Sequence, residues 1–131
     1  MNDRQQVSPA VVDAATRAWH EELRIPLRIA TGTEAFSLAL PFYSSDSPAE
    51  FIHFSTKQAP WITTERIARE GLLCVCEATD AGCLEQAKHY ATPATKRIVQ
   101  RFQKKFWGLR GRVIEVVVII VPPRSEVFKK H

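Results

Sequence analysis

The chain has 131 residues, 45% of them hydrophobic and 24% charged, which is typical of a globular protein with one well-packed domain. No apolar run approaches the roughly 18 residues of a membrane span, and the polar N-terminus lacks a signal core, so we expect a cytoplasmic protein. The net charge of +4 is unevenly spread, with −3 in residues 1–50, −1 in residues 51–90 and +8 in residues 91–131. This regional excess can steer phosphate-bearing partners toward the chain, although a solvated surface is the more frequent explanation of such an excess.

Three cysteines, Cys74, Cys76 and Cys83, lie within ten positions of one another. A secreted disulfide framework has an even and dispersed set, so this pattern predicts reduced, buried thiols. Zinc needs about four ligands in paired short spacings, and the sequence lacks the second pair. We therefore predict no metal site. The five glycines also form no phosphate-binding loop of Walker or Rossmann spacing.

The N-terminal segment predicts a helical extension over residues 1–24. Ser8 and Pro9 are typical of an N-cap and a first helical position, and five apolar residues then follow at helical spacing: Val11, Val12, Ala15, Trp19 and Leu23. Pro26 ends this helix, because the residue before a proline is displaced from helical geometry.

The segment after Pro26 predicts a strand over residues 26–31, with Arg28 on the opposite side from Leu27 and Ile29. Residues 35–40 fit either a short helix, which we favour, or one strand of a hairpin. The polar cluster at residues 44–48 predicts a surface loop.

Residues 50–58 predict a strand that carries an unusual pair of polar groups. Phe51, His53 and Ser55 alternate with Ile52, Phe54 and Thr56. An imidazole and a hydroxyl therefore share one face of a strand that is otherwise apolar. Either they form a satisfied hydrogen bond in the core, or they belong to a ligand site.

The rest of the chain predicts further alternation of helices and strands. We expect a short helix over residues 61–71 that ends at Gly71, a strand over residues 72–77 and a short helix over residues 84–91. The β-branched run at residues 112–121 is the strongest strand signal, and a last strand fits residues 126–129. Residues 1–131 thus form a single α+β domain, whose core covers residues 26–131.

Thr92 and Pro93 repeat the cap-and-proline pattern, and Ile98, Phe102 and Phe106 recur every four residues. These features predict a helix over residues 92–107 with one apolar face. Its remaining surface is basic: Lys96, Arg97, Arg101, Lys104 and Lys105. One functional hypothesis is therefore a non-catalytic module that binds RNA or DNA through residues 92–112. Another is a flavin-binding split barrel, with a hairpin over residues 27–42 and a long strand over residues 111–121.

Residues 26–77, with Phe51-Ile52-His53-Phe54-Ser55-Thr56 as their most specific part, resemble the small bacterial domain-of-unknown-function family 952. That family is grouped with the ADP-ribosyltransferase-like fold. The resemblance implies a split sheet with flanking short helices, to which this chain adds its N-terminal helix. It also implies NAD as the cofactor or, as in related RNA 2′-phosphotransferases, action on an RNA 2′-phosphate.

The resemblance further implies roles for individual residues. His53 with Ser55 or Thr56 would hold the adenosine ribose, Arg28 would meet the pyrophosphate and Tyr90 would stack on the nicotinamide. A late-strand carboxylate, Glu126 or else Glu115, would stabilise the positive charge that develops on the sugar when the glycosidic bond breaks. Each of these side chains also has a simpler interpretation as a packing or surface residue.

Overall fold

The computed structural model describes residues 3–33, 36, 39–40, 44–46, 48–50, 62–106 and 109–124. The elements follow in the order α1 (Asp3–Leu23), β1 (Ile29–Gly32), β2 (Ala49–Glu50), α3 (Thr64–Glu70), β3 (Leu72–Glu77), α4 (Ala81–Lys88), β4 (Lys96–Phe106) and β5 (Leu109–Val121). Among these residues, five strands form one sheet in the order β2-β1-β3-β5-β4. Strand β1 pairs in parallel with β2 and with β3, while β3–β5 and β4–β5 are antiparallel. The predicted α+β fold is confirmed.

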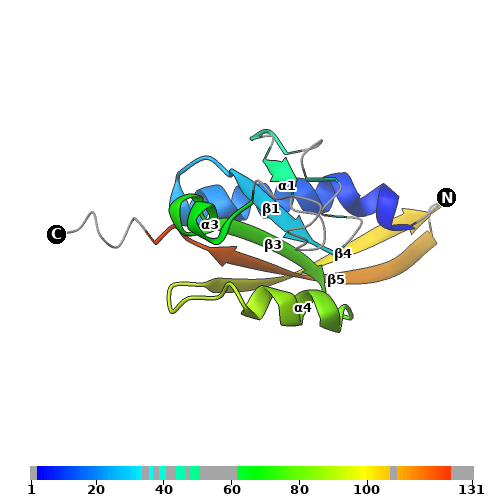
Figure 1. Ribbon diagram of the computed structural model, residues 1–131. Helices are drawn as coiled ribbons and strands as arrows, with labels where there is room; N and C mark the ends of the chain where they lie inside the picture. The colour runs from blue at the N-terminus through cyan, green and yellow to red at the C-terminus, as the bar shows by residue number, and fades with distance from the viewer. Residues whose placement is uncertain are drawn as a thin grey trace.

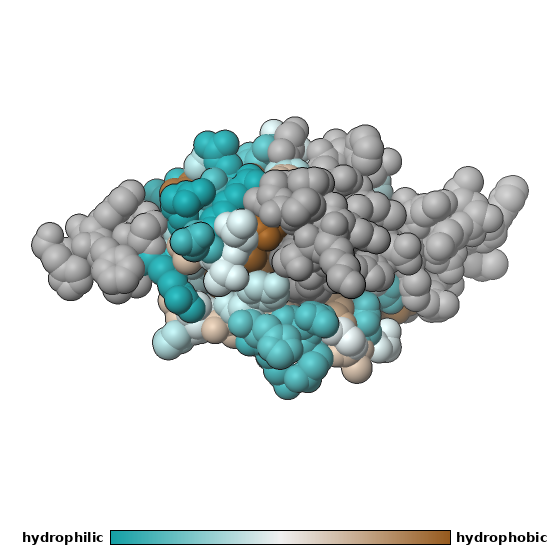
Figure 2. Space-filling model, in the orientation of Figure 1, coloured by the Kyte–Doolittle hydropathy of each residue, from teal (hydrophilic) through white to brown (hydrophobic). Residues whose placement is uncertain are grey.

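Helices cover both faces of the sheet, because its central strands are apolar on both sides. In β3, Leu73 and Val75 belong to a core shared with α1, whereas Leu72 and Cys74 belong to a second core that includes residues of α3 and α4. Alternate side chains of a strand point to opposite faces, so the two cores are separated by the sheet. Figure 1 shows α1 on one side of the sheet and α4 on the other. In Figure 2 the surface over α3 and α4 is mainly hydrophilic.

Helix α1 packs the apolar stripe that the sequence indicates, since Val11, Val12, Ala15 and Trp19 are fully buried. Its predicted start is wrong, however: the helix begins at Asp3 and contains Pro9. Among the described residues no helix is long and apolar enough to cross a membrane.

The polar segment at residues 44–48 is not simply a surface loop, as we expected from its composition. Ser44 is buried, and its Oγ lies 3.0 Å from the Thr16 Oγ1 of α1. Asp46 Oδ2 accepts a 2.6 Å hydrogen bond from the Leu27 backbone N–H and lies 2.9 Å from His20 Nε2. The segment therefore attaches the chain before β1 to the end of α1.

The predicted helix at residues 92–107 is wrong, because residues 96–106 form β4. Spacing by four residues also satisfies a strand, in which every second side chain shares a face. The β-branched β5 decides between the two patterns by pairing along the whole of β4, from Lys96 opposite Ile120 to Phe106 opposite Leu109. The Thr92-Pro93 pattern forms a turn instead, in which the Thr95 backbone N–H bonds the Thr92 carbonyl oxygen.

Several other boundaries are confirmed or moved. The strands at 72–77 and 112–121 and the helix closed by Gly71 are present, while the helix expected at 84–91 begins earlier, at Ala81. Leu27 and Ile29 do not share a face, because Leu27 precedes β1 and packs in the α1 core.

The hairpin of the flavin-barrel hypothesis is also wrong: Phe36, Ala39 and Leu40 are helical, and β1 pairs with strands parallel to it. The strand at 51–56 and that at 126–129 lie outside the described residues.

Candidate functional site

The order β2-β1-β3 contains a change in the direction of the chain across the sheet. From β1 the chain passes Phe36 and Leu40, which pack in the α1 core, and then forms β2 on one side of β1. From β2 it passes through α3, where Ile67 packs in the core on the opposite face, and forms β3 on the other side of β1. Open sheets bind ligands outside the carboxyl ends of the strands at such a switch point. The carboxyl ends of β1 and β3 are therefore the first place to look for a site.

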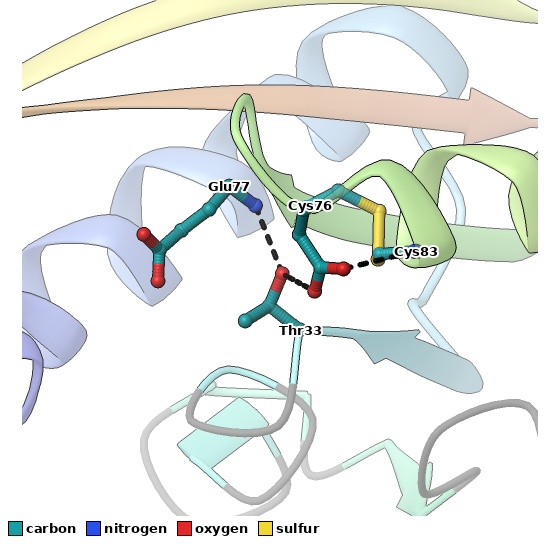
Figure 3. The surroundings of a disulfide bond; sticks show 5 residues. Thr33, Cys76, Glu77 and Cys83 are labelled. Atoms are coloured by element: carbon teal, nitrogen blue, oxygen red, sulfur yellow. Dashed lines mark hydrogen bonds between the residues drawn. A yellow bond between two sulfur atoms is a disulfide. The ribbon is translucent and has the colours of Figure 1, made fainter.

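A network of buried and half-buried polar groups lies at this end. Thr33 directly follows β1, and its hydroxyl accepts a 2.9 Å hydrogen bond from the Glu77 backbone N–H. The same hydroxyl donates a 2.9 Å hydrogen bond to Asp80 Oδ2 (Figure 3). The Thr33 backbone N–H in turn donates to the Val75 carbonyl oxygen. The end of β1 is thus fastened to the corner between β3 and α4.

Asp80 has a second function in this corner as the N-cap of α4. Its Oδ1 accepts a hydrogen bond of 3.1 Å from the Cys83 backbone N–H. A carboxylate at this position satisfies an otherwise unpaired helix donor and meets the positive end of the helix dipole. Both oxygens of Asp80 are therefore occupied, which holds the side chain in one orientation.

Glu77 adds a carboxylate that is almost completely removed from solvent, with 6% of the residue exposed. It is the last residue of β3, and its side chain points away from Cys76 to the face covered by α1 (Figure 3). Burial of a carboxylate is costly unless the surroundings stabilise it. A carboxylate that remains buried at a switch point is a candidate functional group.

A disulfide between Cys76 of β3 and Cys83 of α4 closes the other side of the corner. The prediction of three reduced thiols is therefore wrong for these two residues, and it is confirmed for the buried Cys74. The pairing arises because the turn at Thr79 and Asp80 folds α4 back under β3, which brings the two Cα atoms to 5.8 Å. That distance suits a disulfide.

The predicted ribose-binding residues His53, Ser55 and Thr56 lie outside the described part of the chain. The strand that leads to them, β2, is described. Ala49 pairs with Ile29 and Glu50 with Ala30 in parallel, so β2 runs toward the carboxyl end of β1. Glu50, the last residue described before position 62, lies opposite Ala30, and β2 there points toward the end of the sheet where Thr33, Glu77 and Asp80 lie.

Two other predicted residues lie at the opposite end of the sheet. Arg28 precedes β1, and its carbonyl oxygen accepts the Ala49 backbone N–H. Tyr90 follows α4 and lines a pocket with eight further residues: Thr64, Ile67, Ala68, His89, Thr92, Val121, Pro122 and Arg124. Burial raises the pKa of the Tyr90 hydroxyl, and the nearby Cys74 adds to the effect. Glu126 lies outside the described residues, two positions after Arg124.

The predicted basic residues lie along β4. Lys96 Nζ is 3.3 Å from a carboxylate oxygen of Glu22 in α1, and Arg101 Nε is 3.0 Å from one of Glu115 in β5. Lys104 and Lys105 are in the same strand, beside its bulge. The alternative carboxylate Glu115 is thus paired with an arginine across the two strands.

Sequence reasoning missed Thr33, Glu77 and Asp80 as a group. A signal was present, since a polar residue ends or follows each of the two buried segments at residues 29–32 and 72–77. Within the described ranges, no cluster of three or more His, Cys, Asp or Glu side chains is placed to hold a metal ion. No family model, curated protein or solved structure matches the chain. The resemblance to family 952 therefore stays a prediction.

Proposed function

We propose that this protein binds NAD or a phosphorylated ribose at the carboxyl ends of β1, β2 and β3, with His53 as the central residue. The observation that carries the proposal is the switch point between β1 and β3, together with the direction of β2 toward it. Thr33 and Glu77, which are buried, and Asp80, which is half-buried, form a polar wall there. Ribose hydroxyls are donors and acceptors, so an imidazole and hydroxyls beside this wall would suit a sugar.

A dinucleotide ligand would also account for Arg28 and Tyr90. Arg28 and Tyr90 lie at the amino end of β1, whose four residues span about 13 Å at the usual rise of a strand. An extended ligand with ribose at one end and nicotinamide at the other could contact both groups. In this arrangement Arg28 meets the pyrophosphate and Tyr90 offers its ring to the nicotinamide.

The enzymatic part of the proposal is transfer or hydrolysis at the nicotinamide ribose, in the manner of ADP-ribosyltransferases. The bond between the ribose carbon and the nicotinamide nitrogen breaks, nicotinamide leaves with the bonding electrons, and an acceptor oxygen attacks the sugar. Glu126 would stabilise the positive charge on the ribose. It occupies this role in preference to Glu115, which is held by Arg101.

Calorimetric titration with NAD and with ADP-ribose tests the binding step directly. We expect saturable binding, and a ligand at 100 times its Kd should stabilise the fold by about 2.7 kcal/mol. His53→Ala should abolish the heat of binding, while Gln86→Ala, an exposed change on α4, should leave it intact. Absence of binding by the parent protein, or equal binding by both variants, would refute the proposal.

Release of nicotinamide from NAD tests the enzymatic step. Glu126→Gln should abolish release while NAD still binds, and Glu115→Gln should retain it. If Glu115→Gln stops the reaction and Glu126→Gln does not, Glu115 and not Glu126 stabilises the positive charge on the ribose. If the parent protein binds NAD but releases no nicotinamide in the presence of water or RNA acceptors, the protein is a binding module and not a transferase.

The proposed location is the cytoplasm, where thiol systems normally keep cysteines reduced. The Cys76–Cys83 bond gives this point a clear test. Cells quenched in acid and then alkylated under denaturing conditions should show label on all three cysteines if the protein occupies a reducing compartment. Labelling of Cys74 alone, after denaturation, would instead indicate an oxidising compartment.

A further inference from the structure

Strands β4 and β5 form a long two-stranded ribbon that extends past the rest of the sheet. Strand β3 pairs with β5 only from Val116 to Val121, opposite Glu77 to Leu72. Residues 109–115 and their partners in 101–106 therefore continue beyond the end of β3, as Figure 1 shows. At about 3.3 Å per residue, seven residues of β5 extend roughly 20 Å.

The two faces of this ribbon differ. On one face, Ile98 and Phe102 pack against the core that α1 shares, and Lys96 reaches Glu22 of that helix. On the other face, Val99 is 60% exposed and Val113 is 54% exposed. These are the exposed large hydrophobic residues among those the structure describes. The second face is thus an open sheet surface with aliphatic side chains between polar ones.

The ribbon also contains the basic charge of the chain. Residues 96–115 include seven Lys or Arg and a single carboxylate, Glu115, for a net charge of +6. Because the whole chain has a net charge of +4, the remaining residues sum to −2. The partner that complements this ribbon is therefore strongly anionic.

We propose that the open face of the β4–β5 ribbon binds double-stranded DNA, independently of the nucleotide site proposed above. A two-stranded ribbon fits the major groove of B-DNA, which is about 12 Å wide. Arg97 and Arg101 would contact phosphates, while the exposed Val99 and Val113 would contact apolar groups such as thymine methyls. The deep, narrow major groove of duplex RNA does not admit such a ribbon. A second copy of the chain is disfavoured, since two ribbons of +6 would repel each other.

The Arg101–Glu115 pair makes the proposal more specific. The Arg101 side chain is 75% exposed and that of Glu115 is 41% exposed, so solvent screens the pair and it contributes little to the stability of the fold. The Glu115 carboxylate competes with a DNA phosphate for Arg101, and its negative charge also repels the phosphates directly. Glu115→Gln should therefore tighten DNA binding, the opposite of the effect expected at a residue that supports the ribbon.

Fluorescence anisotropy with a 20-base-pair DNA duplex at 50 to 200 mM salt tests the ribbon. Arg97→Gln with Arg101→Gln should weaken binding and reduce the slope of log K against log salt by about 1.8, since each phosphate contact contributes about 0.9. A matched control is Arg17→Gln with Lys88→Gln, which removes the same charge from exposed sites on α1 and α4. This control should leave the slope unchanged.

Each possible outcome decides for or against the proposal. Binding by the parent protein, a reduced slope in the ribbon variant alone and tighter binding by Glu115→Gln would support it. Lack of binding at 50 mM salt, equal losses in both double variants, or tighter binding of duplex RNA than of DNA would overturn it. Equal affinity for polyglutamate would also overturn it, because only charge would then be recognised. If light scattering shows a dimer of the parent protein and a monomer of the Arg97→Gln, Arg101→Gln variant, the open face binds a second copy of the chain instead of DNA.

Discussion

The Thr33 hydroxyl donates a 2.9 Å hydrogen bond to Asp80 Oδ2 across a sequence separation of 47 residues. The hydroxyl also accepts from the Glu77 backbone N–H, and the carboxylate also caps α4. One side-chain pair therefore fixes the end of β1, the end of β3 and the start of α4 relative to one another. If the carboxyl end of the sheet binds a ligand, this pair gives it a rigid floor.

Loss of the Asp80 carboxylate should destabilise the fold more than loss of an ordinary cap. Asp80→Ala removes the cap of α4 and the acceptor of Thr33, so we expect a cost of about 2 to 3 kcal/mol in urea unfolding. Thr63→Ala is the control, because Thr63 is an N-cap whose hydroxyl accepts a hydrogen bond from the Arg66 backbone N–H. Its loss should lower the free energy of unfolding by about 1 kcal/mol. A double-mutant cycle with Thr33→Val should give a coupling of at least about 0.5 kcal/mol. Additive effects would show that the two residues act separately.

The Cys76–Cys83 disulfide should stabilise the fold moderately, since it closes a short loop with a sequence separation of 7. Loop-closure entropy for this length amounts to about 2 to 3 kcal/mol. Replacing both cysteines by serine should lower the free energy of unfolding by this amount, and dithiothreitol should destabilise the parent protein but not the variant. Unfolded, unreduced protein should contain one free thiol, that of Cys74. Three free thiols would show that the bond does not form.

Sequence patterns sufficed where burial alone decides the structure. The continuous apolar run at residues 72–76 and the β-branched run at 112–121 become most of β3 and β5, because a strand between two helical layers is apolar on both faces. The stripe of Val11, Ala15 and Trp19 becomes the buried side of α1. Each of these signals is local and has one interpretation.

Patterns failed where two interpretations share one spacing or where the partner is distant in sequence. Ile98 and Phe102 fit a helix and a strand equally well, and only their pairing with β5 decides. Cys76 and Cys83 meet because of a turn, which counting cysteines does not reveal. The network of Thr33, Glu77 and Asp80 joins segments more than 40 residues apart. Such a site emerges only when the strand order is known.

Three glycines provide a graded test of the packing around the sheet. A Cβ on Gly32 would lie 2.0 Å from the Val75 carbonyl oxygen, and one on Gly71 would lie 2.8 Å from the Trp19 ring. Both residues have positive φ, 152° and 85°, which an L-residue adopts only with strain. Gly32→Ala should therefore be the most destabilising change or prevent folding, and Gly71→Ala should cost more than about 1 kcal/mol. Gly82→Ala, on the exposed side of α4 with its nearest atom at 3.7 Å, should stabilise by about 0.5 kcal/mol. Unfolding curves that do not follow this order would contradict the close contact of β1 with β3 and of α1 with Gly71.

The buried thiol of Cys74 should make the stability of the fold depend on alkaline pH. Complete burial raises the pKa of this thiol far above its ordinary value of roughly 8.5, because the thiolate loses its hydration. Above about pH 8.5 the thiol releases its proton in the unfolded chain and keeps it in the folded chain, so the free energy of unfolding falls as pH rises. The slope rises from half of its full value at pH 8.5 toward about 1.4 kcal/mol per pH unit, so about 1.6 kcal/mol should be lost between pH 8.5 and pH 10.

Urea unfolding of the oxidised protein from pH 7 to pH 10 measures this slope. Cys74→Ala is the decisive variant: it should be less stable than the parent at pH 7 because of the cavity, yet its stability should change much less up to pH 10. The pKa of Tyr90 is raised as well, but a tyrosine in the unfolded chain is half ionised only near pH 10, so its contribution falls mainly at the end of this range. Tyr90→Phe should therefore leave the slope between pH 8.5 and pH 9.5 unchanged. Parallel pH curves for the parent and Cys74→Ala would mean that the thiol is ionised or hydrated in the folded state, and that β3 is less completely buried than its neighbours indicate.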